Sequence, residues 1–157
     1  MFSVQLGAPP NKALQPVRWA TKDIMSFDLA VWYPHQQLSA EAALRVYQNL
    51  CEGNLSDLEP HPAIAAFYGE LTAKHPEVDD IPEDQIDDHD LCPWSIAHER
   101  SDRHMIICSV WSKAAYVHEF IRELARKHGL IVFDPQESAI TYPDGSPGSK
   151  KPWWRFW

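Results

Sequence analysis

Residue types that bind zinc are concentrated between residues 89 and 108 of the sequence. They are His89, Cys92, His98, His104 and Cys108, and the His89-x-x-Cys92 spacing is one that a zinc ion tolerates. The closely spaced cysteine pairs that mark structural zinc sites do not occur in the sequence. A thiol within an apolar strand, the expected place of Cys108, packs as a small hydrophobic group. We therefore predict no metal ion and no cofactor, and a metal site on these residues is the alternative.

Acid–base catalysis by Asp28 and Asp134 is a second possible chemistry, because the topology predicted below brings these residues together across neighbouring strands. Two carboxylates a few ångströms apart push one pKa upward and can share a proton. Alternatively, each carboxylate accepts hydrogen bonds from backbone N–H groups or lies solvated at a strand end. Cys51 with a histidine could form a nucleophile and base, but its place on the apolar side of a predicted helix favours a structural thiol.

Sequence motifs for nucleophilic catalysis and phosphate binding are also missing. The sequence contains no Gly-x-Ser-x-Gly motif and no glycine-rich phosphate loop before a helix. We therefore predict a protein that is not an enzyme. A small metal-dependent or acid/base enzyme of unknown substrate is the alternative function.

The most specific feature is the stretch of residues 77–90, called the acidic segment below. It holds eight Asp and Glu residues and no Lys or Arg, which leaves 14 acids and 14 bases in the rest of the chain, so the whole net charge of −8 lies here. Nucleic-acid binding needs clustered Lys and Arg, which this balance does not provide. Such a run is commonly a solvated loop, but contiguous carboxylates also steer and bind a basic protein partner. The predicted contact residues are Asp79, Asp80, Glu83, Asp84, Asp87, Asp88 and Asp90.

Aromatic residues are the second predicted part of a partner-binding surface, because Trp and Tyr often supply much of the binding energy at interfaces. The chain ends in Pro-Trp-Trp-Arg-Phe-Trp, an apolar patch that is costly to leave in water and that includes Trp153 and Trp154. The predicted topology also gathers Trp94, Trp32 and Trp111 at one end of the sheet, with core packing as the alternative for the last two. Trp94, Trp153 and Trp154 are predicted to contact the partner.

Apolar periodicity predicts four strands and three helices. Strands are expected from alternating or continuous apolar runs at residues 27–33, 91–99, 104–111 and 130–133. Helices are expected where apolar residues recur at helical spacing, and their starts are expected at Ser39, Pro62 and Ser112. Gly53 and Gly129 are suited to end the first and third helices.

Counting the first two helices as one crossover gives the order β-α-β-β-α-β, the split arrangement of ferredoxin-like folds. We therefore predict an α+β protein with a four-stranded, mostly antiparallel sheet and three helices on one face. In this topology the first and third strands are parallel at the centre. The fourth strand lies beside the first, and the second lies beside the third.

One folded domain is predicted, with an extension at each end. Residues 1–24 form an extended arm, residues 25–142 a single α+β domain, and residues 143–157 a flexible tail that ends in aromatic residues. No run reaches the roughly 18 apolar residues of a membrane span, so no membrane partner is expected. Three cysteines at long spacing fit the reducing cytoplasm better than a disulfide framework, which predicts a cytoplasmic location.

Short sequence strings carry a resemblance to a group of proteins. Ser-Phe-Asp-Leu-Ala-Val-Trp from Ser26, Val-Trp-Ser-Lys-Ala from Val110 and His-Gly-Leu-Ile-Val-Phe-Asp-Pro-Gln from His128 resemble small, mostly uncharacterised bacterial α/β proteins with an FDLAVW start and a late GLVxFDPQ motif. The resemblance covers about residues 25–136. By size and charge the chain is also similar to immunity proteins of bacterial polymorphic toxins. This resemblance implies a cytoplasmic inhibitor that occludes a cognate toxin with a basic cleft.

Overall fold

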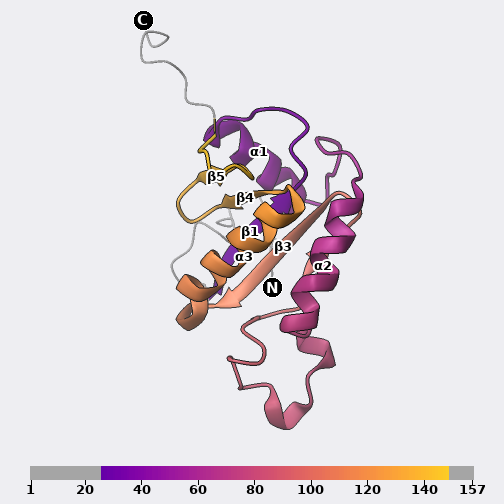
Figure 1. The fold of residues 1–157 in the computed structure, drawn as a ribbon, viewed down its shortest axis with the longest axis vertical. Coiled ribbons are helices and arrows are strands. Elements are labelled where there is room, and N and C mark those ends of the chain that lie inside the picture. The colour runs from indigo at the N-terminus through magenta and orange to yellow at the C-terminus, as the bar shows by residue number, and fades with distance from the viewer. Residues whose placement is uncertain (1–25, 149–157) are drawn as a thin grey trace, which may run out of the picture.

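The described part of the chain contains five strands and three α-helices, arranged as shown in Figure 1. The computed structural model describes residues 26–148. The strands are β1 (Ser26–Trp32), β2 (Glu99–Arg100), β3 (His104–Val110), β4 (Ile131–Asp134) and β5 (Ala139–Thr141). The α-helices are α1 (Ala40–Cys51), α2 (Pro62–Lys74) and α3 (Ala114–His128). Short 3-10 turns complete the order, namely η3 (Val78–Asp80), η4 (Glu83–Gln85) and η5 (Trp111–Lys113).

The helix ends follow the capping chemistry of the sequence, with one exception. Ser39 caps α1, its side-chain oxygen accepting a hydrogen bond from the backbone N–H of Ala42 at 3.1 Å, and Pro62 is the first residue of α2. Gly129 ends α3 with a φ of 71°, the left-handed conformation that glycine adopts without strain. The predicted cap at Ser112 is wrong. Ser112 lies inside η5, and α3 begins only at Ala114.

The sheet has the strand order β2-β3-β1-β4-β5, and every pair in it is antiparallel. β4 lies beside β1 and β2 beside β3, as predicted. The strand predicted over residues 91–99 is wrong, because β2 contains only Glu99 and Arg100 and the stretch before it forms a single isolated bridge, between Trp94 and Ser109. The prediction of four strands with parallel first and third strands is wrong, because β1 and β3 are antiparallel. Between β1 and the hairpin the chain passes through two separate helices rather than one crossover. This connection brings β2 back parallel to β1, and the turn between β2 and β3 then reverses the chain, so β3 runs antiparallel to β1.

Helices cover both faces of this sheet, and the prediction that all three lie on one face is wrong. The side chains of β1 alternate between two buried clusters, with Leu29 on the face covered by α2 and α3 and Trp32 on the face covered by α1. All seven residues of β1 are buried. A strand that is apolar on both faces needs cover on both, so the fold is α+β with one helix on one face and two on the other.

A hydrogen-bonded turn after β5 continues the folded region past Tyr142, the predicted end of the domain. After β5 the chain turns back, and the backbone N–H of Tyr142 donates to the Ser146 carbonyl at 2.8 Å. The backbone N–H of Gly148 then donates to the Ile140 carbonyl at 3.2 Å. Residues 143–148 therefore belong to the domain. The predicted arm at residues 1–24 and the rest of the predicted tail lie outside the described residues.

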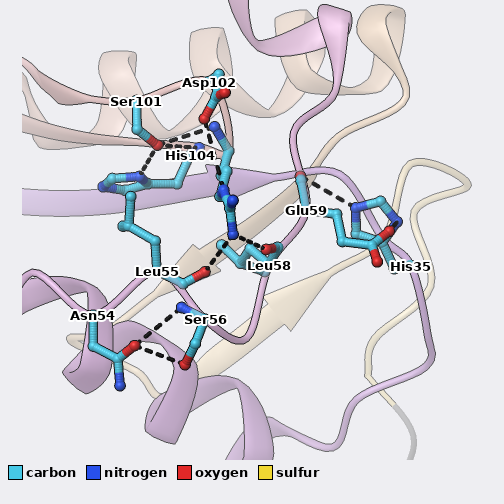
Figure 2. Close-up of polar contacts among 10 residues, drawn as sticks. His35, Asn54, Leu55, Ser56, Leu58, Glu59, Ser101, Asp102 and His104 are labelled. Atoms are coloured by element: carbon cyan, nitrogen blue, oxygen red, sulfur yellow. Dashed lines mark hydrogen bonds and ion pairs between the residues drawn. The ribbon is translucent and has the colours of Figure 1, made fainter.

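The β2–β3 turn is tied to the connection between α1 and α2 (Figure 2). The Arg103 guanidinium donates hydrogen bonds from Nη1 to the backbone carbonyls of Leu58 at 2.8 Å and Leu55 at 3.3 Å. Within the turn, Ser101 Oγ lies 2.7 Å from His104 Nδ1. These contacts hold the hairpin against a loop that contains no regular secondary structure.

Of the helices described in residues 26–148, none is long and apolar enough to cross a bilayer.

Replacing Arg103 with Met is expected to lower the free energy of unfolding by about 1–3 kcal/mol, because two carbonyls lose a charged donor while the apolar stem of the side chain is kept. Urea denaturation measures this change. Arg45→Met is the matched control, since Arg45 is 66% exposed in its side chain and makes only an ion pair with Glu41. We expect the control to change stability by no more than about 0.5 kcal/mol. Equal effects of the two substitutions would contradict the anchoring role of Arg103.

Candidate functional site

The acidic segment leaves α2 and extends away from the sheet, at the lower end of the view in Figure 1. It contains the two short turns η3 and η4, and local hydrogen bonds continue after them, such as that from the Asp88 backbone N–H to the Gln85 carbonyl at 3.0 Å. Six of its carboxylates are exposed and form no ion pair with any residue in the range 26–148. They are Asp79, Asp80, Glu83, Asp84, Asp87 and Asp88.

Glu77 anchors the beginning of the segment to the domain. Tyr68 Oη donates a hydrogen bond to one carboxylate oxygen at 3.1 Å, and the backbone N–H of His98 donates to the other at 3.1 Å. Burial and the Glu77 carboxylate raise the pKa of Tyr68, and the phenol therefore stays a donor. The Arg100 guanidinium lies over the Tyr68 ring at 3.9 Å from its centre. Glu77 is thus a structural carboxylate within the segment.

The end of the segment is held by His75 and Asp90. His75 Nδ1 lies 2.9 Å from the Leu91 carbonyl oxygen, and its Nε2 lies 2.7 Å from Tyr116 Oη in α3. Asp90 forms an ion pair with Lys113 of η5, and this hydrogen bond lowers the pKa of the Asp90 carboxyl. Asp90 is therefore largely neutralised by its own chain, unlike the six carboxylates before it.

Exposed aromatic side chains lie beside this anchored end. Trp111 is 55% exposed and Tyr116 is 42% exposed, although both residue types are usually more buried. Trp111 lies two residues from the lysine that binds Asp90, and Tyr116 contacts the histidine that binds the Leu91 carbonyl. Ile86, within the acidic segment, is 44% exposed. Carboxylates and large apolar side chains therefore lie close together on one part of the surface.

The predicted tryptophan contacts have different places in the structure. Trp94 is only 3% exposed, and its indole Nε1 donates to the His75 carbonyl at 3.1 Å, so it packs in the core rather than on the partner surface. The prediction that three tryptophans meet at one end of the sheet is wrong. Trp32 pairs with His104 at the start of β3 while Trp111 follows the end of β3, because β1 and β3 are antiparallel. Trp153 and Trp154 lie outside the described residues.

The two candidate catalytic carboxylates do not face each other. Gln136 lies beside both, donating from Nε2 to the Asp134 carboxylate at 2.6 Å and to the Asp28 backbone carbonyl at 2.8 Å. The Asp28 side chain lies on the α1 face, whereas Asp134 Oδ2 lies 4.0 Å from His118 of α3 on the other face. The predicted approach of these residues along neighbouring strands is confirmed, but a shared proton between their carboxylates is not possible in this arrangement.

The candidate zinc ligands are also dispersed. Cys92 belongs to the cluster under α2 and α3, and Cys108 to the cluster under α1. His104 lies near Ser101 and 3.4 Å from the Glu99 carboxylate, and burial lowers its pKa. Throughout residues 26–148, no three His, Cys, Asp or Glu side chains converge as a metal site would require. The His89-x-x-Cys92 spacing does not lead to a set of ligands there.

A cavity of about 560 Å³ on the α1 face was not predicted from the sequence. Residues from four separate parts of the chain line it, including Asp28 of β1, Tyr47 and Glu52 around the end of α1, and Glu99 and Ile106 of the hairpin. The cavity forms beside α1 because this helix packs mainly toward β4 and β5, away from β3 and the two-residue strand β2. Comparison with protein-family models, curated proteins and solved structures finds no match to this chain.

Proposed function

We propose that this protein binds a basic protein partner through the acidic segment and the exposed aromatic residues beside it. The observation that carries the proposal is the set of six exposed carboxylates that no cation of residues 26–148 neutralises. Such a cluster attracts a basic surface over several ångströms and accelerates association at low ionic strength. Trp111 and Tyr116 supply the apolar contact area that carboxylates alone lack.

The anchoring of the segment supports a binding role beyond that of a solvated loop. Hydrogen bonds from Tyr68 and His98 hold its beginning, and His75 and Lys113 hold its end. A surface that is ordered before binding loses less conformational entropy when it meets its partner. The arrangement therefore favours specific recognition of one basic surface.

The partner class that we propose is a cognate bacterial toxin with a basic cleft, and the role is that of a cytoplasmic immunity protein. The acidic segment would enter the cleft and occupy the site at which the toxin binds an anionic substrate. This mechanism is inhibition by occlusion, so it requires no catalytic residue, metal or cofactor in the inhibitor. The carboxylates of Asp28 and Asp134 lie on opposite faces of the sheet and cannot share a proton, which favours inhibition by occlusion over acid/base catalysis.

The test is co-expression with toxin domains encoded beside this gene, followed by association kinetics with the purified toxin that it neutralises. Replacing Asp84, Asp87 and Asp88 together with Lys is expected to slow association by about tenfold or more at low salt, because the attractive potential is reversed. The wild-type association rate is expected to fall steeply as salt is added, and that of the variant is not.

A second triple variant, Glu41, Glu59 and Glu123 to Lys, is the matched control. It changes the net charge by the same amount at exposed positions outside the acidic segment. We expect its association rate to stay within about threefold of the wild-type rate. Equal slowing by both triple variants would show that total charge rather than this surface governs association, and failure of every neighbouring toxin to bind would refute the immunity role.

A further inference from the structure

The cavity on the α1 face contains a buried carboxylate that forms no ion pair with any residue in the range 26–148. Asp28 is 2% exposed, and the Ser26 hydroxyl donates a hydrogen bond to its Oδ1 at 3.2 Å. No Lys, Arg or His of the described chain forms an ion pair with it. A buried carboxylate is costly unless an opposite charge or several hydrogen bonds compensate it.

The other polar groups around this cavity have the same sign of charge or none. Glu52 and Glu99 lie at its exposed rim, and no Lys, Arg or His is among its lining residues. Burial, followed by the nearby Cys51 and Asp28, raises the pKa of Tyr47, whose phenol therefore remains protonated. The cavity thus has one carboxylate in its buried part and two carboxylates at its exposed rim.

The lining of the cavity also includes large apolar surfaces, from the Tyr47 ring and from Ile96 and Ile106. A volume of about 560 Å³ is within the range of small-molecule sites, roughly 300–1,000 Å³. A metal ion does not fit, because no three potential ligand side chains of residues 26–148 converge. The buried carboxylate of Asp28, the exposed carboxylates of Glu52 and Glu99 and the apolar part of the lining together match a molecule with two separated cationic groups on a hydrocarbon chain.

We propose that this cavity binds a small aliphatic diamine, with one ammonium group at Asp28 and the other at the rim near Glu52 and Glu99. The methylene groups lie against Tyr47, Ile96 and Ile106. The buried ammonium forms a charge-assisted hydrogen bond with the Asp28 carboxylate, which supplies most of the specificity. This site is separate from the acidic segment, since no residue of 77–90 lines the cavity.

The experiment titrates the full chain with cadaverine by isothermal calorimetry, with pentanediol as the neutral probe of equal chain length. We expect saturable binding of one cadaverine per chain and no heat of binding with pentanediol. Asp28→Asn, which keeps the size of the side chain, is expected to weaken cadaverine binding by at least about tenfold. Glu52→Gln is expected to weaken it by a smaller factor, because that carboxylate is exposed and screened.

The control for non-specific attraction to an acidic protein is Asp87→Asn, which removes one charge from the acidic segment. It should bind cadaverine within about twofold of the wild type. Circular dichroism establishes that Asp28→Asn is folded, and methyl NMR of Ile96 and Ile106 in the wild type locates the diamine independently of any variant. Unperturbed methyl signals, no saturable binding to the wild type, or equal loss in Asp28→Asn and Asp87→Asn would overturn the proposal. None of these outcomes bears on toxin binding.

Discussion

Replacing Phe67 or Phe133 with Ala is expected to lower the free energy of unfolding by about 3–5 kcal/mol in each case. Both side chains are completely buried, but they lie on opposite faces of the sheet. Phe67 projects from α2 into the cluster beneath α2 and α3. Phe133 of β4 packs against Trp32 and Tyr47, with ring centres 6.2 Å and 5.6 Å away. Each substitution removes a large apolar side chain and leaves a cavity that the close-packed surroundings fill only in part.

Chemical denaturation of both variants measures whether the two faces are equally part of the core. Ile86→Ala, in the acidic segment, is the control for loss of an apolar side chain at an exposed position, and a change within about 0.5 kcal/mol is expected. A loss of less than about 1 kcal/mol for either phenylalanine would mean that its face is not closely packed.

Part of the local structure of this protein is predictable from its sequence, whereas the strand directions and the layering are not. The alternation of residues 27–33, the cap at Ser39 and the left-handed residue at Gly129 depend on neighbours in the chain, and all three are found in the structure. The direction of β3 depends on the orientation in which the long connection through α1 and α2 returns to the sheet, because the hairpin turn then reverses it. The layering depends on the packing of α1 and α2 on different faces, which no local pattern records.

For the candidate sites, too, features that depend on the local sequence are predictable, and features that depend on distant contacts are not. The exposure of the acidic segment follows from its composition, and it is found. The burial of Trp94 follows instead from a contact with His75, which is far from it in the sequence. Asp28 and Asp134 were expected to meet, and their strands do meet, but a strand reverses its faces with every residue. A difference of one residue in the position of Asp134 along β4 therefore separates the two carboxylates by the thickness of the sheet. The cavity, which four chain segments build, had no signal in the sequence.

The second large effect concerns His98, whose side chain is inaccessible to solvent and lies behind the acidic segment. Burial lowers its pKa from 6.5 to about 4, and the nearby Arg100 acts in the same direction. Glu77 acts in the opposite direction, with its Oε1 3.6 Å from His98 Nε2. The imidazole ring also packs edge-on against Trp94, with ring centres 4.7 Å apart. The His98 imidazole is therefore neutral in the folded protein at neutral pH.

Acidification is expected to destabilise the protein through this histidine. Between pH 6.5 and about 4 the unfolded chain protonates His98 while the folded chain does not, so the free energy of unfolding falls as the pH falls. The full displacement of the pKa corresponds to about 3 kcal/mol. His98→Phe removes the titrating group and keeps a planar ring beside Trp94. We expect its free energy of unfolding to fall by about 3 kcal/mol less than that of the wild type between pH 7 and pH 4, measured by urea denaturation at each pH.

The difference between the two curves isolates His98, because the carboxyl groups and the buried His104 titrate in both proteins. Glu77→Gln provides a test in the opposite direction. Loss of the Glu77 carboxylate removes the one nearby charge that raises the pKa of His98, so the stability of this variant should fall more steeply than that of the wild type toward pH 4. NMR titration of the His98 ring gives the folded-state pKa directly. Parallel stability curves for the wild type and His98→Phe would show that the buried imidazole contributes nothing to the acid sensitivity, and that its folded and unfolded pKa values are equal.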